Sequence, residues 1–398
     1  MKKNRRKICV VTANRADFSR LETVLESIDE HPNLDLQLIV MGSHLLDKAG
    51  YTIREIENKG FTVNQRIFME IAGETPTTMA KSVGLAMIEL STAFDYLKPD
   101  LVLTHGDRYE ALAVGTTAAM MNIHVGHIQG GEVSGNIDES VRHALTKFSH
   151  LHFVSTEKSR ERVIKMGEDP DTVFNTGCPG TDLLLRTPKK DRFTTLKQLI
   201  DEVIQTKEKL NPALSYILMI QHPVTTEHKS AGSQILETLN ALQKRREQLI
   251  ILWPNIDAGA DNLSQALRKH SILQKRGVII FKHLPSHIFI NVLRNAACIV
   301  GNSSSGIREA CYFGTPVVNI GSRQDNRERG GNVVDMPYLA DKIFHAIKNQ
   351  IMHGVYPVEQ IFGDGMAGKK LTDIFPALPY SFEGLQEQKR VTFNDFTY

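Results

Sequence analysis

Residues 99–143 read PDLVLTHGDRYEALAVGTTAAMMNIHVGHIQGGEVSGNIDESVRH, and two short apolar runs in this stretch predict buried parallel strands. The runs are residues 101–104 and 124–129, with a helix of small residues expected between them. Carboxylates follow the runs, at Asp107, Glu132, Asp138 and Glu139. Open parallel sheets bind ligands at the carboxyl ends of neighbouring strands. We therefore expect a carboxylate site suited to proton transfer, because burial and mutual repulsion separate the pKa values of neighbouring carboxyl groups.

The same alternation of strand and helix patterns runs through most of the chain. The expected strands are residues 7–13, 34–41, 61–68, 101–104, 124–129, 151–155, 173–175, 216–221, 249–253, 278–281, 298–300 and 316–320. The expected helices are residues 19–30, 47–59, 77–97, 109–121, 137–147, 157–166, 233–244, 262–270, 286–294 and 306–313. Repeated βα units predict an α/β protein with doubly wound parallel sheets and right-handed crossovers.

The length of 398 residues favours two domains. Residues 187–214 lose the alternating pattern and carry many charges, so we interpret them as the junction. The expected domains are residues 1–186, which hold the carboxylates, and residues 187–375, with a cleft between them. Residues 376–398 form a separate tail, for which a return onto the first domain is one option.

Composition excludes several classes of partner. The net charge is only +2, so bulk electrostatics predict neither a nucleic acid nor an anionic membrane as partner. No apolar run approaches the ~18 residues of a membrane-spanning helix, and the start does not resemble a signal peptide. The four cysteines form no CxxC pair, which favours reduced thiols in a cytoplasmic protein.

The first βα turn, residues 12–17, contains no glycine. A dinucleotide pyrophosphate needs glycine there for close approach to the backbone, so no nicotinamide or flavin cofactor is expected. Arg15 in this turn is either a phosphate ligand or a surface arginine beside the next helix.

Residues 301–309 read GNSSSGIRE and join an expected strand to an expected helix. Ser303, Ser304 and free backbone N–H groups suit an anion, and Glu309 suits a ribose diol; an ordinary capped helix start is the alternative. His222 and Arg323 also follow strands. With Arg15 and the serines they form a plausible clamp for a diphosphate.

Histidines are frequent in the first half, but most are expected to be packed or on helix surfaces. They lack the close spacing typical of a zinc or dimetal centre, so no metal is predicted. A metal-dependent hydrolase remains an alternative, built on His105, Asp107, His127 and Asp138.

A set of motifs, in order, resembles the hydrolysing UDP-N-acetylglucosamine 2-epimerases of sialic acid synthesis. They are NRADFSRL, GSHLLD, HGDRYEAL, HIQGGEVSGNIDESVRHALTK, QHPVTT, PNIDAG, GNSSSGIRE and FGTPVVNIGSRQ, between about Lys7 and Lys370. The resemblance implies the glycosyltransferase-B architecture, in which two Rossmann-like domains bind the nucleotide sugar between them. It also implies UDP-N-acetylglucosamine as substrate, UDP as product, and a homodimer or homotetramer.

The resemblance further implies roles for individual residues. The candidate catalytic residues are Asp107, Glu132, Asp138, Glu139 and His222. The candidate substrate-binding residues are Arg15, Ser19, His44, Arg108, Gln129, Arg142, Asp182, His222, Asn255, His283, Ser303, Ser304, Glu309 and Arg323. Many relatives have a glutamate where this chain has Gln129, and an amide cannot exchange a proton at pH 7. The segment from Gly177 to Asp182 looks more like enzymes of the plain N-acetyl sugar than those of diacetamido-trideoxy sugars.

The chemistry favours the same reaction. The C2 proton of an N-acetylhexosamine is not adjacent to a carbonyl group, so inversion needs transient oxidation or loss of the anomeric leaving group. The absent glycine fingerprint argues against oxidation, and a diphosphate clamp beside carboxylates favours elimination to 2-acetamidoglucal followed by hydration. The alternatives are a non-hydrolysing epimerase, a glycosyltransferase of the same fold, and a nucleotide-sugar sensor without turnover.

Overall fold

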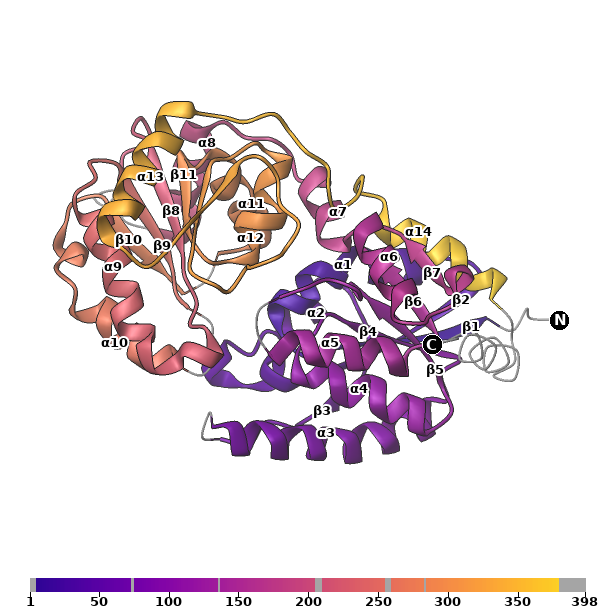
Figure 1. Cartoon of the computed structure of the whole chain (residues 1–398). Helices are drawn as coiled ribbons and strands as arrows, with labels where there is room; N and C mark the ends of the chain where they lie inside the picture. The colour runs from indigo at the N-terminus through magenta and orange to yellow at the C-terminus, as the bar shows by residue number, and fades with distance from the viewer. Residues whose placement is uncertain are drawn as a thin grey trace. The chain divides into compact units, whose positions relative to one another are not determined.

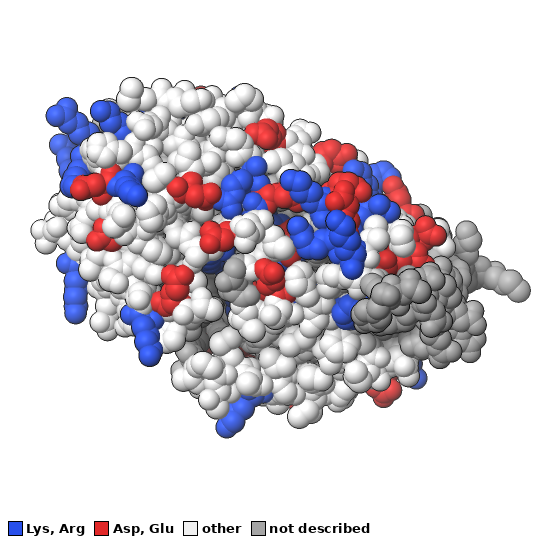
Figure 2. All heavy atoms as spheres, viewed as in Figure 1, with Lys and Arg blue, Asp and Glu red and all other residues white. Residues whose placement is uncertain are grey.

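The computed structural model describes residues 5–72, 75–134, 137–204, 210–254, 259–282 and 284–378. The chain divides into two compact units. The first is built on residues 5–132, 137–186 and 362–378, and the second on residues 133–134 and 187–361. Within the described parts, no helix is both long enough and apolar enough to cross a membrane. Figure 2 shows basic and acidic side chains interspersed on one face, as the small net charge leads us to expect.

The first unit contains a parallel sheet of seven strands in the order β3-β2-β1-β4-β5-β6-β7. Its strands are β1 (Arg6–Thr12), β2 (Leu34–Met41), β3 (Val63–Ile67), β4 (Leu101–His105), β5 (His124–Ile128), β6 (Leu151–Val154) and β7 (Val173–Asn175). Its helices are α1 (Arg15–Asp29), α2 (Ile53–Asn58), α3 (Pro76–Leu97), α4 (Tyr109–Met120), α5 (Ile137–Phe148), α6 (Glu157–Lys165), α7 (Pro179–Arg186) and α14 (Ala367–Ile374).

The second unit contains a parallel sheet of six strands in the order β10-β9-β8-β11-β12-β13. Its strands are β8 (Tyr216–Ile220), β9 (Gln248–Leu252), β10 (Val278–Phe281), β11 (Cys298–Gly301), β12 (Val317–Ile320) and β13 (Val333–Met336). Its helices are α8 (Arg192–Leu199), α9 (Ala231–Gln243), α10 (Ala260–Lys269), α11 (Ser286–Asn295), α12 (Ser304–Arg308) and α13 (Ala340–His353). Both strand orders are Rossmann-like, which confirms the predicted fold class.

Each sheet is buried on both faces because residues along its strands alternate between two layers of helices. On β1, Ile8 and Val10 pack in one apolar cluster, which also contains residues of α1 and α14. Cys9 and Val11 pack in the other cluster, with residues of α3 and α4. This two-sided burial explains why the strands appear in the sequence as continuous apolar runs.

All the expected strands are present, with bounds that differ by at most two residues. The expected helix over residues 47–59 is wrong, since only a turn of 3-10 helix (Asp47–Ala49) and α2 form there. Gly50 and Tyr51 separate the two pieces and have φ values of 93° and 47°, which a right-handed helix cannot contain. The expected helix over residues 306–313 is likewise divided, into α12 and a 3-10 turn over Ala310–Tyr312.

The second domain was expected to continue to residue 375, but the chain rejoins the first unit at Phe362. Figure 1 shows the yellow α14 beside α1 and α7 of the first unit. Two bonds hold the segment that follows, because the buried Arg6 donates from Nη1 to the Phe375 carbonyl and from Nη2 to the Leu378 carbonyl, each at 2.6 Å. The boundary between the second domain and the segment that returns to the first unit therefore lies before the expected one, and residues 379–398 of the expected tail lie outside the described residues.

Candidate active site

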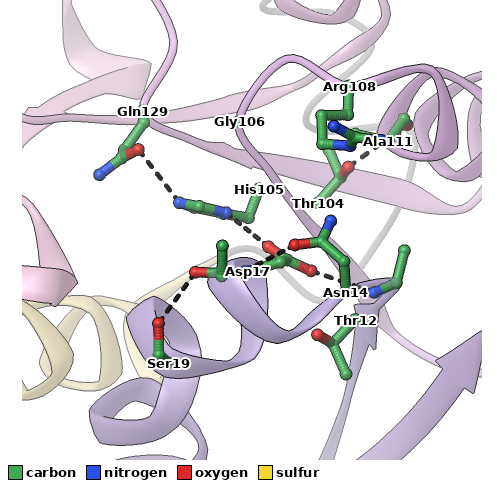
Figure 3. Close-up of polar contacts among 12 residues, drawn as sticks. Thr12, Asn14, Asp17, Ser19, Thr104, His105, Gly106, Arg108, Ala111 and Gln129 are labelled. Carbon is green, nitrogen blue, oxygen red and sulfur yellow. Dashed lines mark hydrogen bonds and ion pairs between the residues drawn. The ribbon is translucent and has the colours of Figure 1, made fainter. Parts of the chain in front are cut away.

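In the first unit, polar side chains gather at the carboxyl ends of β1, β4 and β5. The strand order reverses between β1 and β4, which is where Rossmann-like sheets bind their ligands. Figure 3 shows His105, the last residue of β4, between Asp17 of α1 and Gln129, which follows β5. Asp17 Oδ1 lies 2.5 Å from His105 Nδ1, and Gln129 Oε1 lies 3.1 Å from His105 Nε2.

The start of α1 fixes the Asp17 side chain. Asn14 caps this helix, and its Oδ1 accepts a hydrogen bond from the Asp17 amide at 3.0 Å. Asp17 Oδ2 accepts from the Ala13 amide at 3.2 Å, while its other oxygen faces His105. Because the carboxylate is bonded on both oxygens, it ties the end of β1 to the end of β4.

Gln129 extends this network to the loop before α7. Its φ of 67° is rare for a non-glycine residue, and its side-chain Nε2 donates to Cys178 Sγ at 2.6 Å. This orientation leaves Oε1 as the acceptor for His105. His105 is thus held on both ring nitrogens, by the Asp17 carboxylate on one side and the Gln129 amide oxygen on the other. Sequence reasoning missed Asp17, although NRADFSRL was among the motifs quoted.

Asp107, two residues beyond β4, forms an ion pair with Arg142 of α5. Arg142 also donates to the Glu132 carbonyl at 2.8 Å. The guanidinium is almost completely buried, whereas about a quarter of the Asp107 side chain, 23%, is exposed. A buried arginine thus holds a partly accessible carboxylate at the sheet edge, so the structure brings together two of the predicted site residues.

Three further candidate carboxylates lie beyond β5. Glu132 is buried, Asp138 is half-buried in the first turn of α5, and Glu139 lies one residue further on. Glu139 Oε1 is 3.7 Å from His143 Nε2, one helical turn away. Burial, together with the neighbouring Arg142, lowers the pKa of His143. The roles of these three carboxylates remain predictions.

The other predicted residues of the first β-α turns make local contacts. Arg15 Nε lies 3.4 Å from a Glu55 oxygen, and burial lowers the pKa of Arg15 to about 10. The Ser19 hydroxyl donates to the Ala16 carbonyl at 3.0 Å. Arg108 Nε donates to both carboxylate oxygens of Glu110. These contacts leave the expected substrate roles as predictions.

Two further predicted substrate-binding residues are buried and make hydrogen bonds within the protein. His44 is fully buried, with Nε2 3.2 Å from the Thr12 hydroxyl and Nδ1 2.7 Å from the Thr52 hydroxyl. Asp182 is also fully buried, and it accepts from the Ala367 and Gly368 amides at 3.0 and 2.8 Å. These bonds cap the start of α14, so we now interpret Asp182 as an anchor for that helix.

In the second unit, the expected anion-binding segment follows β11. Ser303 caps α12, and its hydroxyl accepts from the Ser305 amide at 3.3 Å. Glu309 Oε2 is buried and makes no hydrogen bond within the described structure. His222 and Arg323 follow β8 and β12. The predicted residues Asn255 and His283 lie outside the described residues.

The metal-dependent alternative finds no support in the strand register. Thr104 pairs with His127, so His105 is one position out of step with His127 and their side chains lie on opposite faces of the sheet. His127 Nε2 instead donates to the Gly106 carbonyl at 2.8 Å, and burial lowers the pKa of His127 to about 3. No group of three or more potential metal ligands occurs among the described residues.

A protein-family model described as UDP-N-acetylglucosamine 2-epimerase matches residues 26–376. The chain belongs to this family. It is 35% identical over 374 residues to the UDP-N,N'-diacetylbacillosamine 2-epimerase (hydrolyzing) of Legionella pneumophila, covering 94% of this chain and 96% of the relative. It is 34% identical over 361 residues to the UDP-N-acetylglucosamine 2-epimerase of Neisseria meningitidis, covering 90% and 91%.

Solved structures agree with this assignment at the level of the fold. The crystal structure of the Neisseria meningitidis UDP-GlcNAc 2-epimerase bound to UDP-GlcNAc has a TM-score of 0.76 and covers 94% of this chain and 100% of that one, at 17% identity. A Methanocaldococcus jannaschii UDP-GlcNAc 2-epimerase in complex with UDP-GlcNAc and UDP has a TM-score of 0.73 over the same 94% of this chain and 100% of that one, also at 17% identity.

The surroundings of His44 predict a pH dependence of stability in this epimerase-family chain. Burial lowers its pKa to about 4. As the pH falls below about 6.5, unfolded chains bind a proton at this position while folded ones do not, so His44 costs about 2 kcal/mol of stability between pH 7 and pH 5. In His44→Gln, the free energy of unfolding in urea, followed by circular dichroism, should fall about 2 kcal/mol less over that interval. If the free energy of unfolding changed equally with pH in both proteins, His44 would not be the group responsible. The difference in unfolding free energy between the two proteins at pH 7 measures the effect of the substitution on packing.

Proposed function

We propose that the protein is a hydrolysing UDP-N-acetylglucosamine 2-epimerase, which converts UDP-N-acetylglucosamine and water to N-acetylmannosamine and UDP. Membership of the family supports epimerisation of a UDP-sugar. The observation that carries the site assignment is Asp107, a partly exposed carboxylate held by the buried Arg142 at the carboxyl edge of the first sheet. The hydrolysing form is favoured because relatives at 35% and 34% identity carry that term in their names.

The proposed reaction begins with elimination. The C1–O bond to UDP breaks while a base removes the C2 proton from the opposite face, and 2-acetamidoglucal forms. Water then adds across the double bond. Its oxygen bonds to C1, and a proton is delivered to C2 on the face opposite to the one from which the first proton was removed, which gives N-acetylmannosamine. Two groups able to exchange protons are required, and we assign the leading role to Asp107 with Glu139 as its partner, since both side chains are partly exposed.

We assign nucleotide binding to the second unit. The serines at the start of α12 and the guanidinium of Arg323 suit a diphosphate, and His222 follows a neighbouring strand. Glu309 suits the ribose diol, because its buried Oε2 is without a hydrogen-bond donor in the described structure and two vicinal hydroxyls would supply donors.

The thiols of Cys9, Cys178, Cys298 and Cys311 are buried and form no disulfide with one another, which suits the proposed location in the cytoplasm.

A second candidate substrate is UDP-N,N'-diacetylbacillosamine. The observation in its favour is the name of the Legionella pneumophila relative. Its identity of 35% is slightly above the 34% of the Neisseria meningitidis UDP-N-acetylglucosamine 2-epimerase. The same elimination and hydration would apply, since the two sugars differ away from C1 and C2. A non-hydrolysing epimerase would differ in the second step, where UDP rather than water adds to the glycal.

The reaction itself can be tested in D2O. Purified protein incubated with UDP-N-acetylglucosamine should release UDP and N-acetylmannosamine with one deuteron at C2, because the removed proton exchanges with solvent. The products can be identified by proton NMR and mass spectrometry, with UDP-N,N'-diacetylbacillosamine offered in parallel and expected to have the lower kcat/KM. A product that retains UDP would support the non-hydrolysing form, and a product without deuterium at C2 would contradict elimination.

The role of Asp107 can be tested against an aspartate at the other end of the same strand. Asp107→Asn should reduce kcat at least ~100-fold, as expected for loss of a general acid or base. The control is Asp100→Asn, because Asp100 precedes β4, is exposed and accepts only from the Lys7 amide at 2.8 Å among its described side-chain contacts. Melting temperatures of both variants exclude unfolding as the cause. Near-normal turnover in Asp107→Asn would show that another carboxylate does the work.

We also propose that the protein is a homo-oligomer whose interface includes the outer face of α3. Ile88 and Tyr96 on this helix are 64% and 76% exposed, and the nearby α4 ends in the exposed Met120. Light scattering should give a mass of two or four chains, and Ile88→Lys should lower it. Leu85 on the same helix is half-buried, so Leu85→Met serves as the control. A monomer at micromolar concentration would contradict the proposal.

A further inference from the structure

Asn302 is almost completely buried, at 1% exposure, and follows β11 in the middle of the second sheet. The sequence analysis predicted Ser303 and Ser304 of the same motif as binding residues and did not include Asn302. Its backbone and its side chain both make hydrogen bonds to the ends of neighbouring strands. These bonds involve the segments that carry three predicted nucleotide-binding residues: His222, Ser303 and Arg323.

The backbone before Asn302 lies unusually close to β8. Gly301 has a φ of 131°, and a Cβ atom there would be 2.1 Å from the Ile220 carbonyl oxygen. Only glycine permits this approach. The close approach lets the Asn302 amide donate to the Ile220 carbonyl at 3.0 Å, so Asn302 continues the pairing with β8 one residue beyond the end of β11.

The Asn302 side chain pairs with the backbone of His222. Its Oδ1 accepts from the His222 amide at 2.7 Å, and its Nδ2 donates to the His222 carbonyl at 2.9 Å. An asparagine amide supplies one donor and one acceptor in the same plane, so it can satisfy both polar groups of one residue. Asn302 thus holds both backbone polar groups of His222, and this contributes to the position from which the His222 side chain extends.

The Asn302 carbonyl serves the third segment. It accepts from Arg323 Nη1 at 3.1 Å and from Gln324 Nε2 at 2.9 Å. A guanidinium has five N–H groups, and the bond to Asn302 needs only one of them, so it orients Arg323 without using up its capacity for an anion. Ser303 is the next residue along the chain, and its position follows directly from that of Asn302.

We infer that Asn302 is a positioning residue that sets the relative geometry of His222, Ser303 and Arg323 for the diphosphate of the nucleotide. This inference rests on the proposed function, since it assumes that these three residues bind UDP. Asn302 acts through its neighbours and does not itself touch the ligand. Its loss should weaken binding of the nucleotide while leaving the proton-transferring groups of the first unit unaffected.

The test compares Asn302 with a second buried asparagine of the same sheet. Asn332 is also 1% exposed, and its Nδ2 donates to the Thr315 carbonyl at 2.7 Å, but it precedes β13 and so lies at the amino edge. Asn302→Ser removes two buried side-chain bonds and Asn332→Ser removes one, so both substitutions disturb a buried amide of the same sheet. Asn302→Asp is a second variant, which retains the acceptor for the His222 amide and places a carboxylate oxygen against the His222 carbonyl.

Isothermal titration with UDP alone, followed by kinetics with UDP-N-acetylglucosamine, gives the outcomes. We expect about a tenfold higher Kd for UDP and a similarly raised KM in both Asn302 variants, with kcat within about threefold of the unaltered enzyme. Asn332→Ser should lower the melting temperature without changing Kd. If UDP binds the unaltered enzyme and the two serine variants weaken it equally, or not at all, the positioning role is wrong. Absence of UDP binding by the unaltered enzyme would instead overturn the proposed function.

Discussion

Both sheets are covered by helices on each face, and this constraint determines where chemistry can occur in the molecule. Most side chains along the strands are apolar and closely packed, as Ile8 and Cys9 are on opposite faces of β1. The polar groups of the candidate sites therefore gather at the carboxyl ends of the strands and just beyond them, where backbone N–H and C=O groups also lose their neighbours. The two sheet edges satisfy these groups with side chains, and the candidate sites of both units consist of those side chains.

The two edges use different chemistry for this purpose. In the first unit, titratable and charged side chains dominate: Asp17 contacts His105, and Asp107 pairs with Arg142. In the second unit, a neutral amide, Asn302, makes the bonds between strand ends. The difference suits the proposed division of roles, because proton transfer requires titratable groups, whereas a neutral amide can position the ligands of a diphosphate without adding negative charge beside the anion. Gln129 fits the same logic: as an amide it can accept from His105 and donate to Cys178, which a carboxylate cannot do.

The sequence predicted the strands well because two-sided burial produces apolar runs that are easily recognised. The sequence pattern did not predict the elements whose formation depends on tertiary packing. Helix α8 carries charges and has few apolar residues, yet Leu196 and Leu199 are fully buried. Strand β13 is only half-buried and contains the exposed Asp335, so its apolar pattern is weak. For the site, the pattern located Asp107 and Arg142 but could not show that they pair, since they are 35 residues apart. It also could not distinguish Asp182, which caps a helix 185 residues further along the chain, from a ligand contact.

The contacts of Arg6 determine when the first unit can be completed during synthesis of the chain. Its carbonyl partners lie 369 and 372 residues further along the chain, and α14 packs against α1 from a similar separation. At about 5–20 residues per second, synthesis reaches those partners roughly 20–75 s after Arg6 is made. By then the second unit, which ends at residue 361, has been made in full. During that interval the apolar face of α1 that later receives Leu371 and Phe375 has no cover from them. The first unit therefore begins to form before the second but is completed after it. During synthesis there is a stage at which the whole second unit has been made while the first unit still lacks residues 362–378.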